Sequence, residues 1–130
     1  MKYIYTAVFT PSDDGTKFFA RVPDLPGCIT TGNSLSDAID QITDAASGWL
    51  VVAEDNGDDI NPPSPQDMIN APSGAIKSLI QIDTLEYRAQ TDDRSVRKNV
   101  SLPAWMAAMA DKRNINCSKV LQEGLLQRLA

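Results

Sequence analysis

The stretch VRKNVSLP, residues 96–103, decides how the end of this chain folds. Its second half alternates in the manner of a β-strand, with Val100 and Leu102 on one face and Asn99 and Ser101 on the other. Only two short helices are predicted after it, and no second strand. A lone strand leaves its backbone N–H and C=O groups unpaired, an open edge that natural proteins avoid. The strand therefore needs a partner from outside its own segment.

The predicted helices suggest what that partner is. Pro103 stands where a helix over 104–113 can begin, and Asn116 is a good N-cap for a helix over 117–129. Both helices carry apolar side chains along one side. A strand and two helices of this length cannot bury a core alone, but two copies can. Two strands would pair antiparallel and four helices would cover their apolar face, so we expect a homodimer through residues 96–130.

This arrangement resembles the ribbon-helix-helix fold of small bacterial repressors. The resemblance implies that the outward strand face enters the major groove of operator DNA, which admits a two-stranded ribbon. The reading positions would be Arg97, Asn99 and Ser101. Arg suits guanine, Asn suits adenine, and Ser is permissive.

The second helix would point its N-terminus at a phosphate group. The expected contacts are Asn116, Cys117, Ser118 and Lys119. One residue departs from the pattern, because Lys98 lies on the inward face where an apolar residue is usual. An alternative is that the segment serves dimerisation alone, although Arg97 and Asn99 are poor choices for that purpose.

The first part of the chain predicts an α+β fold. A helix opens at Ser34, with Asp37 at the third position, and its apolar stripe continues to about Asp55. The segments rich in aromatic and β-branched residues predict four strands. These strands cover 3–10, 17–22, 28–32 and 75–83. The order β-β-β-α-β predicts a small sheet with one helix on one face.

Charge divides the chain into two parts. Residues 1–92 carry 5 basic and 14 acidic side chains, a net charge of −9, whereas residues 93–130 carry 7 and 3, a net charge of +4. The change of sign falls near 84–95, which lacks periodicity and reads as a linker between domains at 1–83 and 96–130. An acidic body with a basic tail suggests two different partners.

Composition excludes several classes of protein. The chain has no histidine, which removes the commonest general base and metal ligand, and we predict no cofactor and no metal. Its two cysteines, Cys28 and Cys117, match no ligand spacing and read as reduced thiols. No apolar run reaches the ~20 residues of a membrane span, and no secretory signal is visible, so we expect a cytoplasmic protein without a membrane partner.

The N-terminal part also resembles a known family. The residues VPDLPGCITTGNSLSDAID (22–40), a helix containing Trp49, and EDNGDDINPPS (54–64) resemble the HicB antitoxins. The resemblance covers residues 1–83, and a ribbon-helix-helix tail is one of the endings known in that family. It implies a neutraliser of a HicA-type toxin, a small basic RNA-cleaving protein, and a domain similar to a truncated ribonuclease-H fold.

An acidic domain suits that role, because it would be drawn to a basic RNA-binding surface and mask it. The candidate toxin contacts lie in the stiff, exposed Pro-bounded loop and on or after the helix. They are Asp24, Leu25, Pro26, Trp49 and Glu54. The alternatives for Asp24 and Trp49 are a turn residue and core packing.

Two rival functions stay open. One is a transcriptional repressor whose N-terminal domain senses a small ligand and has no toxin partner. The other is a weak nuclease, which would need clustered carboxylates to hold metal ions. The acidic residues fall in turns or on a solvated helix face, so we expect no enzymatic activity and no catalytic residue. The operator sequence, any oligomer beyond the dimer and the effect of toxin on DNA binding are left open.

Overall fold

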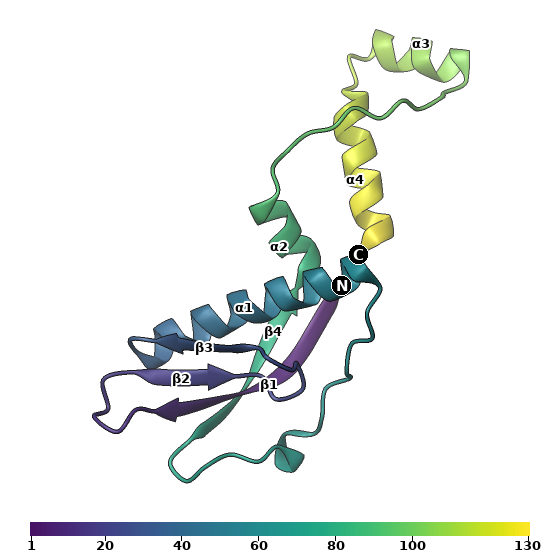
Figure 1. The fold of residues 1–130 in the computed structure, drawn as a ribbon. Helices are drawn as coiled ribbons and strands as arrows, with labels where there is room; N and C mark the ends of the chain where they lie inside the picture. Colours follow the sequence, from purple (N-terminus) through teal and green to yellow (C-terminus); the bar gives the residue numbers. More distant parts are fainter.

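The computed structural model describes all 130 residues and has an α+β architecture. Four strands form one antiparallel sheet in the order β3-β2-β1-β4, and α1 covers one of its faces (Figure 1). The strands are β1 (Lys2–Pro11), β2 (Phe18–Arg21), β3 (Ile29–Gly32) and β4 (Ile76–Asp83). The helices are α1 (Leu35–Asn56), the 3₁₀ turn η1 (Gln66–Met68), α2 (Thr84–Thr91), α3 (Ala104–Lys112) and α4 (Cys117–Leu129). The predicted order of four strands around one long helix is confirmed.

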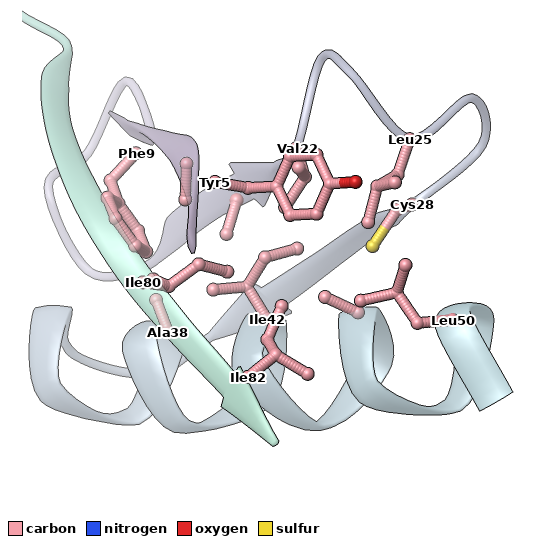
Figure 2. Close-up of a cluster of buried hydrophobic side chains, with 13 residues drawn as sticks. Tyr5, Phe9, Val22, Leu25, Cys28, Ala38, Ile42, Leu50, Ile80 and Ile82 are labelled. Atoms are coloured by element: carbon pink, nitrogen blue, oxygen red, sulfur yellow. The ribbon is translucent and has the colours of Figure 1, made fainter. Parts of the chain in front are cut away.

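The core lies between the sheet and α1. Alternate residues of the central strand, among them Tyr5 and Phe9, face the helix, and Tyr5 is paired across the sheet with Ile80. Figure 2 shows them in one cluster with Ile42 and Leu50, which lie two turns apart on α1. Their burial removes apolar surface from water, which is the main force holding this layer pair together.

The ends of α1 follow the sequence signals. The Ser34 hydroxyl accepts a hydrogen bond from the Asp37 backbone N–H at 3.0 Å, as expected of an N-cap. The helix ends at Gly57, whose φ of 69° is the left-handed conformation that glycine adopts without a steric penalty. A second glycine, Gly32, allows β3 to approach the helix closely, since a Cβ there would lie 2.3 Å from the Ala38 backbone nitrogen.

A connecting segment covers part of the other face of the sheet. Lys77 and Arg21 flank Val8 on that face. The Lys77 ammonium donates to the carbonyls of Gln66 and Ile69, and the Arg21 guanidinium donates to the carbonyl of Asn70. These bonds hold the segment around η1 against the sheet, so Val8 and Ile69 are buried outside the main core.

The segment expected to be a linker contains a helix, which corrects the expectation for residues 84–91. Asp83 caps α2, with its carboxylate accepting from the backbone N–H groups of Leu85 and Glu86. An ion pair between Arg88 and Glu54 fastens α2 to α1. A cap and the ion pairs of Arg88 with Glu54 and Asp55 stabilise a helix too short to show a periodic pattern.

The tail beyond α2 projects away from the sheet (Figure 1). Both of its predicted helices are present as α3 and α4. Residues 92–103, which include the strand predicted within 96–103, form no helix or strand within the single chain. A β-strand needs a neighbour for its ladder of hydrogen bonds, and the single chain supplies none.

Candidate functional site

The loop at residues 23–27 is held in place by its neighbours. The Asp24 carboxylate accepts from the Ser64 backbone N–H at 2.8 Å and from the Ser64 hydroxyl at 2.6 Å. The Asn61 side chain donates to the Asp24 carbonyl. Asp24 therefore joins the loop to the extended segment after α1.

Leu25 does not lie where the sequence predicts. Its side chain is only 1% exposed and belongs to the core, so the expectation of an exposed residue is wrong. Two backbone hydrogen bonds, from Leu25 to Val22 and from Cys28 to Leu25, curl the loop and turn Leu25 inward. Figure 2 shows Leu25 beside Cys28 above α1. A partner cannot reach this side chain without unfolding the loop.

Trp49 and Pro26 occupy the surface beside that loop. The indole nitrogen of Trp49 donates to the Pro26 carbonyl at 2.9 Å, while the ring packs partly against the core. Pro26 itself is exposed. Trp49 is thus both a packing residue and part of the surface, with its orientation fixed by one hydrogen bond.

A shallow groove runs along this side of α1 and the start of β3. We call it the α1–β3 groove. It is lined by Gly27, Cys28, Ile29, Ala45, Gly48, Trp49, Val52, Ala53, Asp58 and Asp59. Among the candidate toxin contacts only Trp49 lines it, and sequence reasoning missed the rest, although two adjacent acids directly after a helix end were a visible signal.

Glu54, the last of the candidate toxin contacts, is engaged within the chain. Its carboxylate accepts hydrogen bonds from Tyr3 at 2.7 Å, from Thr84 at 3.1 Å and from Arg88 at 3.1 Å. We call these four residues the Glu54 cluster. Burial alone would raise the pKa of Glu54, but the three hydrogen bonds outweigh it and lower the pKa below its ordinary value. Burial and the nearby carboxylate raise the pKa of Tyr3 to about 12.

The carboxylates do not form a metal centre. No three acidic or cysteine side chains lie together in a way that could hold a metal ion. Asp14 instead orders its turn by accepting hydrogen bonds from Ser12 and Thr16. The same hydrogen bonds lower the pKa of Asp14 to about 2. Asp37 accepts from the Asn33 backbone N–H at the start of α1.

The tail carries an uncovered apolar surface, which we call the tail groove. Val100 and Leu102 line it together with residues from both helices, so the predicted inward face of the segment does meet the helices. Lys98 lines the same groove. The other lining residues are Met106, Ala110, Ile115, Cys117, Ser118, Val120 and Leu121. The groove is open to solvent, with Val100 still 57% exposed.

The proposed DNA-reading residues lie at the surface of the tail. Arg97, Asn99 and Ser101 are exposed, on a segment whose backbone groups from Ser95 to Leu102 make no hydrogen bond within the chain. Arg97 and Lys119 form no ion pair with any side chain of this chain. Their positive charges are therefore free for a partner.

The start of α4 matches its sequence signal. The Asn116 side chain accepts from the Lys119 backbone N–H at 3.1 Å, which confirms the predicted N-cap. The backbone N–H groups of Cys117 and Ser118 have no acceptor within the chain. They have the orientation in which a helix start presents donors to an anion.

No helix of the chain is both long and apolar enough to cross a membrane.

A sequence profile described as "HicB_like antitoxin of bacterial toxin-antitoxin system" matches residues 5–130. Among curated proteins, none matches.

Three solved structures resemble the chain. A toxin-antitoxin complex from Streptococcus pneumoniae has a chain with 19% identity and a TM-score of 0.61, with 98% of this chain and 99% of that chain covered. The antitoxin HicB of Burkholderia pseudomallei has 26% identity and a TM-score of 0.54, with 98% and 96% covered. A HicA3 and HicB3 toxin-antitoxin complex has 23% identity and a TM-score of 0.51, with 62% and 98% covered.

Proposed function

The chain belongs to the HicB-like antitoxin family of bacterial toxin-antitoxin systems, and from this membership we propose that it neutralises a HicA-type mRNA-cleaving toxin and represses its own operon. The observation that carries the proposal is the division of the chain by charge. The part up to residue 92 has a net charge of −9, and the part beyond it has a net charge of +4. Each part suits a partner of the opposite charge.

The acidic domain is the toxin-binding part. A ribonuclease of this kind needs a basic surface to hold RNA, and an acidic protein competes for the same surface. The match of 62% of this chain to a chain of a solved HicA3 and HicB3 toxin-antitoxin complex supports the proposal of a toxin partner. The sheet with one covering helix is also the arrangement expected of a partial ribonuclease-H-type domain.

The tail is the dimerising part. Its apolar side chains stay exposed on one chain, among them Leu121 and Leu125. Residues 95–102 have backbone groups free to form a ladder. A second copy related by a two-fold axis would pair these segments antiparallel and cover both tail grooves, giving a ribbon-helix-helix domain.

That dimer would present its reading residues to DNA. Pairing through residues 95–102 with Val100 and Leu102 inward would place Arg97, Asn99 and Ser101 on the opposite face, toward the major groove. The start of α4, at Asn116, Cys117, Ser118 and Lys119, would hold a phosphate on each side.

The test uses the short basic open reading frame expected beside the gene of this chain. Cells expressing that frame alone should stop growing, and co-expression of the full chain should restore growth. Rescue by fragment 1–92 as well would place neutralisation in the acidic domain. Failure of the frame to arrest growth would overturn the antitoxin proposal and favour a repressor that senses a ligand.

A further inference from the structure

We propose that the α1–β3 groove is the binding site for the toxin. It would bind a basic segment of the toxin that also carries an apolar side chain. This inference rests on the proposed function, because it names the surface through which that function acts. On the acidic domain, this groove brings exposed apolar side chains and unengaged carboxylates together. Ile29 is 67% exposed and Val52 is 58% exposed, and Asp58 and Asp59 stand at one end.

The groove has a shape that suits a protein segment. Ala45 lines it with a single methyl group, which leaves room for a partner beside α1. Gly48 also lines the groove, but the Tyr87 hydroxyl lies 3.3 Å from the place where its Cβ would be. Trp49 stands next to them with its ring held by the hydrogen bond to the Pro26 carbonyl. A fixed aromatic side chain beside an apolar surface is a common anchor in protein interfaces, since little conformational freedom is lost on binding.

The charge of the groove defines the partner. Asp24 and Glu54 are occupied by hydrogen bonds within the chain, whereas the carboxylates of Asp58 and Asp59 accept none and form no ion pair. Asp58 is nevertheless held in place, because its backbone N–H donates to the Ala53 carbonyl at 2.9 Å. Two unpaired carboxylates beside apolar side chains, the first on a hydrogen-bonded backbone, fit a Lys or Arg flanked by an apolar residue.

No cation of this chain forms an ion pair with Asp58 or Asp59. Met1 lines a pocket with both residues, but its ammonium donates to the Thr84 hydroxyl. The basic side chains of the acidic domain with hydrogen-bonding partners are turned elsewhere. Arg21 and Lys77 bind carbonyls on the other face of the sheet, and Arg88 binds Glu54 and Asp55. The partner must therefore bring its own positive charge.

The experiment measures binding of the full chain to the basic protein encoded beside it. Asp58→Lys/Asp59→Lys and, separately, Val52→Glu should each raise the Kd by at least roughly 30-fold. The matched control Asp13→Lys/Asp40→Lys makes the same change of charge at two exposed residues outside the groove. It should raise the Kd far less, since it acts only through long-range attraction.

The possible outcomes distinguish a failure of the groove proposal from a failure of the proposed antitoxin function. Wild-type affinity in both groove variants would overturn the groove while leaving the antitoxin role in place. Absence of binding by the wild-type chain would overturn both. Light scattering on the free variants gives a third readout. A change of oligomeric mass in the groove variants and not in the control would assign the groove to a second copy of this chain and overturn the proposal.

Discussion

Arg88 lies 3.1 Å from the Glu54 carboxylate and so ties α2, the element that leads to the tail, to the end of α1. The other oxygen of that carboxylate accepts from Tyr3 at the start of β1 and from Thr84 at the start of α2. One side chain thus joins α1, α2 and β1. Because the tail leaves the domain from α2, the Glu54 cluster fixes the point from which the basic part of the molecule extends.

Replacing Glu54 by alanine should lower the free energy of unfolding by about 1–3 kcal/mol, because Tyr3, Thr84 and Arg88 each lose one hydrogen-bond acceptor. Urea denaturation of the full chain at one protein concentration, followed by tryptophan fluorescence, measures it. Asp55→Ala is the matched control, since Asp55 is the exposed partner of Arg88 and should change stability by less than about 1 kcal/mol. Equal losses in both variants would argue against the cluster as the fastening point.

The same cluster predicts how stability changes with pH. The pKa of Glu54 is lowered on folding, so its contribution is present above its ordinary value and is lost as pH falls through the folded value. The pKa of Tyr3 is raised to about 12, so its contribution is present below its ordinary value of 10.0 and is lost as pH rises toward 12. Melting temperatures across the pH range should therefore decline at both ends. Tyr3→Phe should weaken the alkaline decline, and an unchanged alkaline limb would contradict the assignment.

Gly32→Ala should destabilise the chain, because the added Cβ would collide with the Ala38 backbone at 2.3 Å and push β3 from α1. The loss should be about 1–3 kcal/mol, as for other overpacked sites. Gly124→Ala is the control, since nothing lies within 4 Å of a Cβ there. In the middle of α4 that change should stabilise the helix by about 0.5–1 kcal/mol. Thermal unfolding of the two variants should move in opposite directions.

Thr6→Val should leave stability unchanged or raise it. The Thr6 hydroxyl is buried on the central strand and has no hydrogen-bond partner. Valine has nearly the same shape and removes a polar group whose burial without a partner costs about 1–3 kcal/mol. Chemical denaturation measures the difference. A marked loss of stability would mean that the hydroxyl has a water partner that the valine excludes.

The DNA-binding proposal predicts different effects for two basic residues of the tail. Arg97→Ala should cost roughly 1–3 kcal/mol on the cognate operator and relax base preference at one position. Lys119→Ala should weaken binding to all sequences and flatten its dependence on salt. Lys17→Ala, in the acidic part, is the control and should leave operator binding unchanged. Titrations at two salt concentrations distinguish these cases, and wild-type binding by both tail variants would refute the ribbon as the reading element.

Local signals were enough to predict much of the fold. The apolar stripe and the Ser34 cap predicted α1, and segments rich in aromatic and β-branched residues predicted the strands, because these signals are local in the sequence. The helix α2 was missed because its support comes from Glu54, distant in sequence. The burial of Leu25 was missed for a related reason. The neighbouring prolines predict a loop, but they do not predict the backbone hydrogen bonds that turn the Leu25 side chain inward.

The surfaces were harder to predict than the elements. Ile29 and Val52 meet in one groove only after β3 and α1 have packed, so neither stood out in the sequence. Conversely, Asp24 and Glu54 are residue types expected on an exposed acidic surface. Their carboxylates instead accept hydrogen bonds from other residues of the chain. The distinction between an available and an occupied carboxylate depends on its partners, which sequence spacing alone does not identify.

The bare backbone from Ser95 to Leu102 has a consequence for how long the protein survives. Proteases bind their substrates as extended chains, so a segment held by backbone hydrogen bonds must first break them before it is cleaved. This stretch has no backbone hydrogen bonds to break. Arg94, Arg97 and Lys98 are trypsin sites within or beside it. The longer connection between α1 and β4 is instead anchored by Lys77 and Arg21. Trypsin should therefore cut first between the acidic domain and the tail helices. Pairing of two chains through this stretch would protect the cleavage sites. Because pairing increases with protein concentration, the lifetime of the protein would increase with its own abundance.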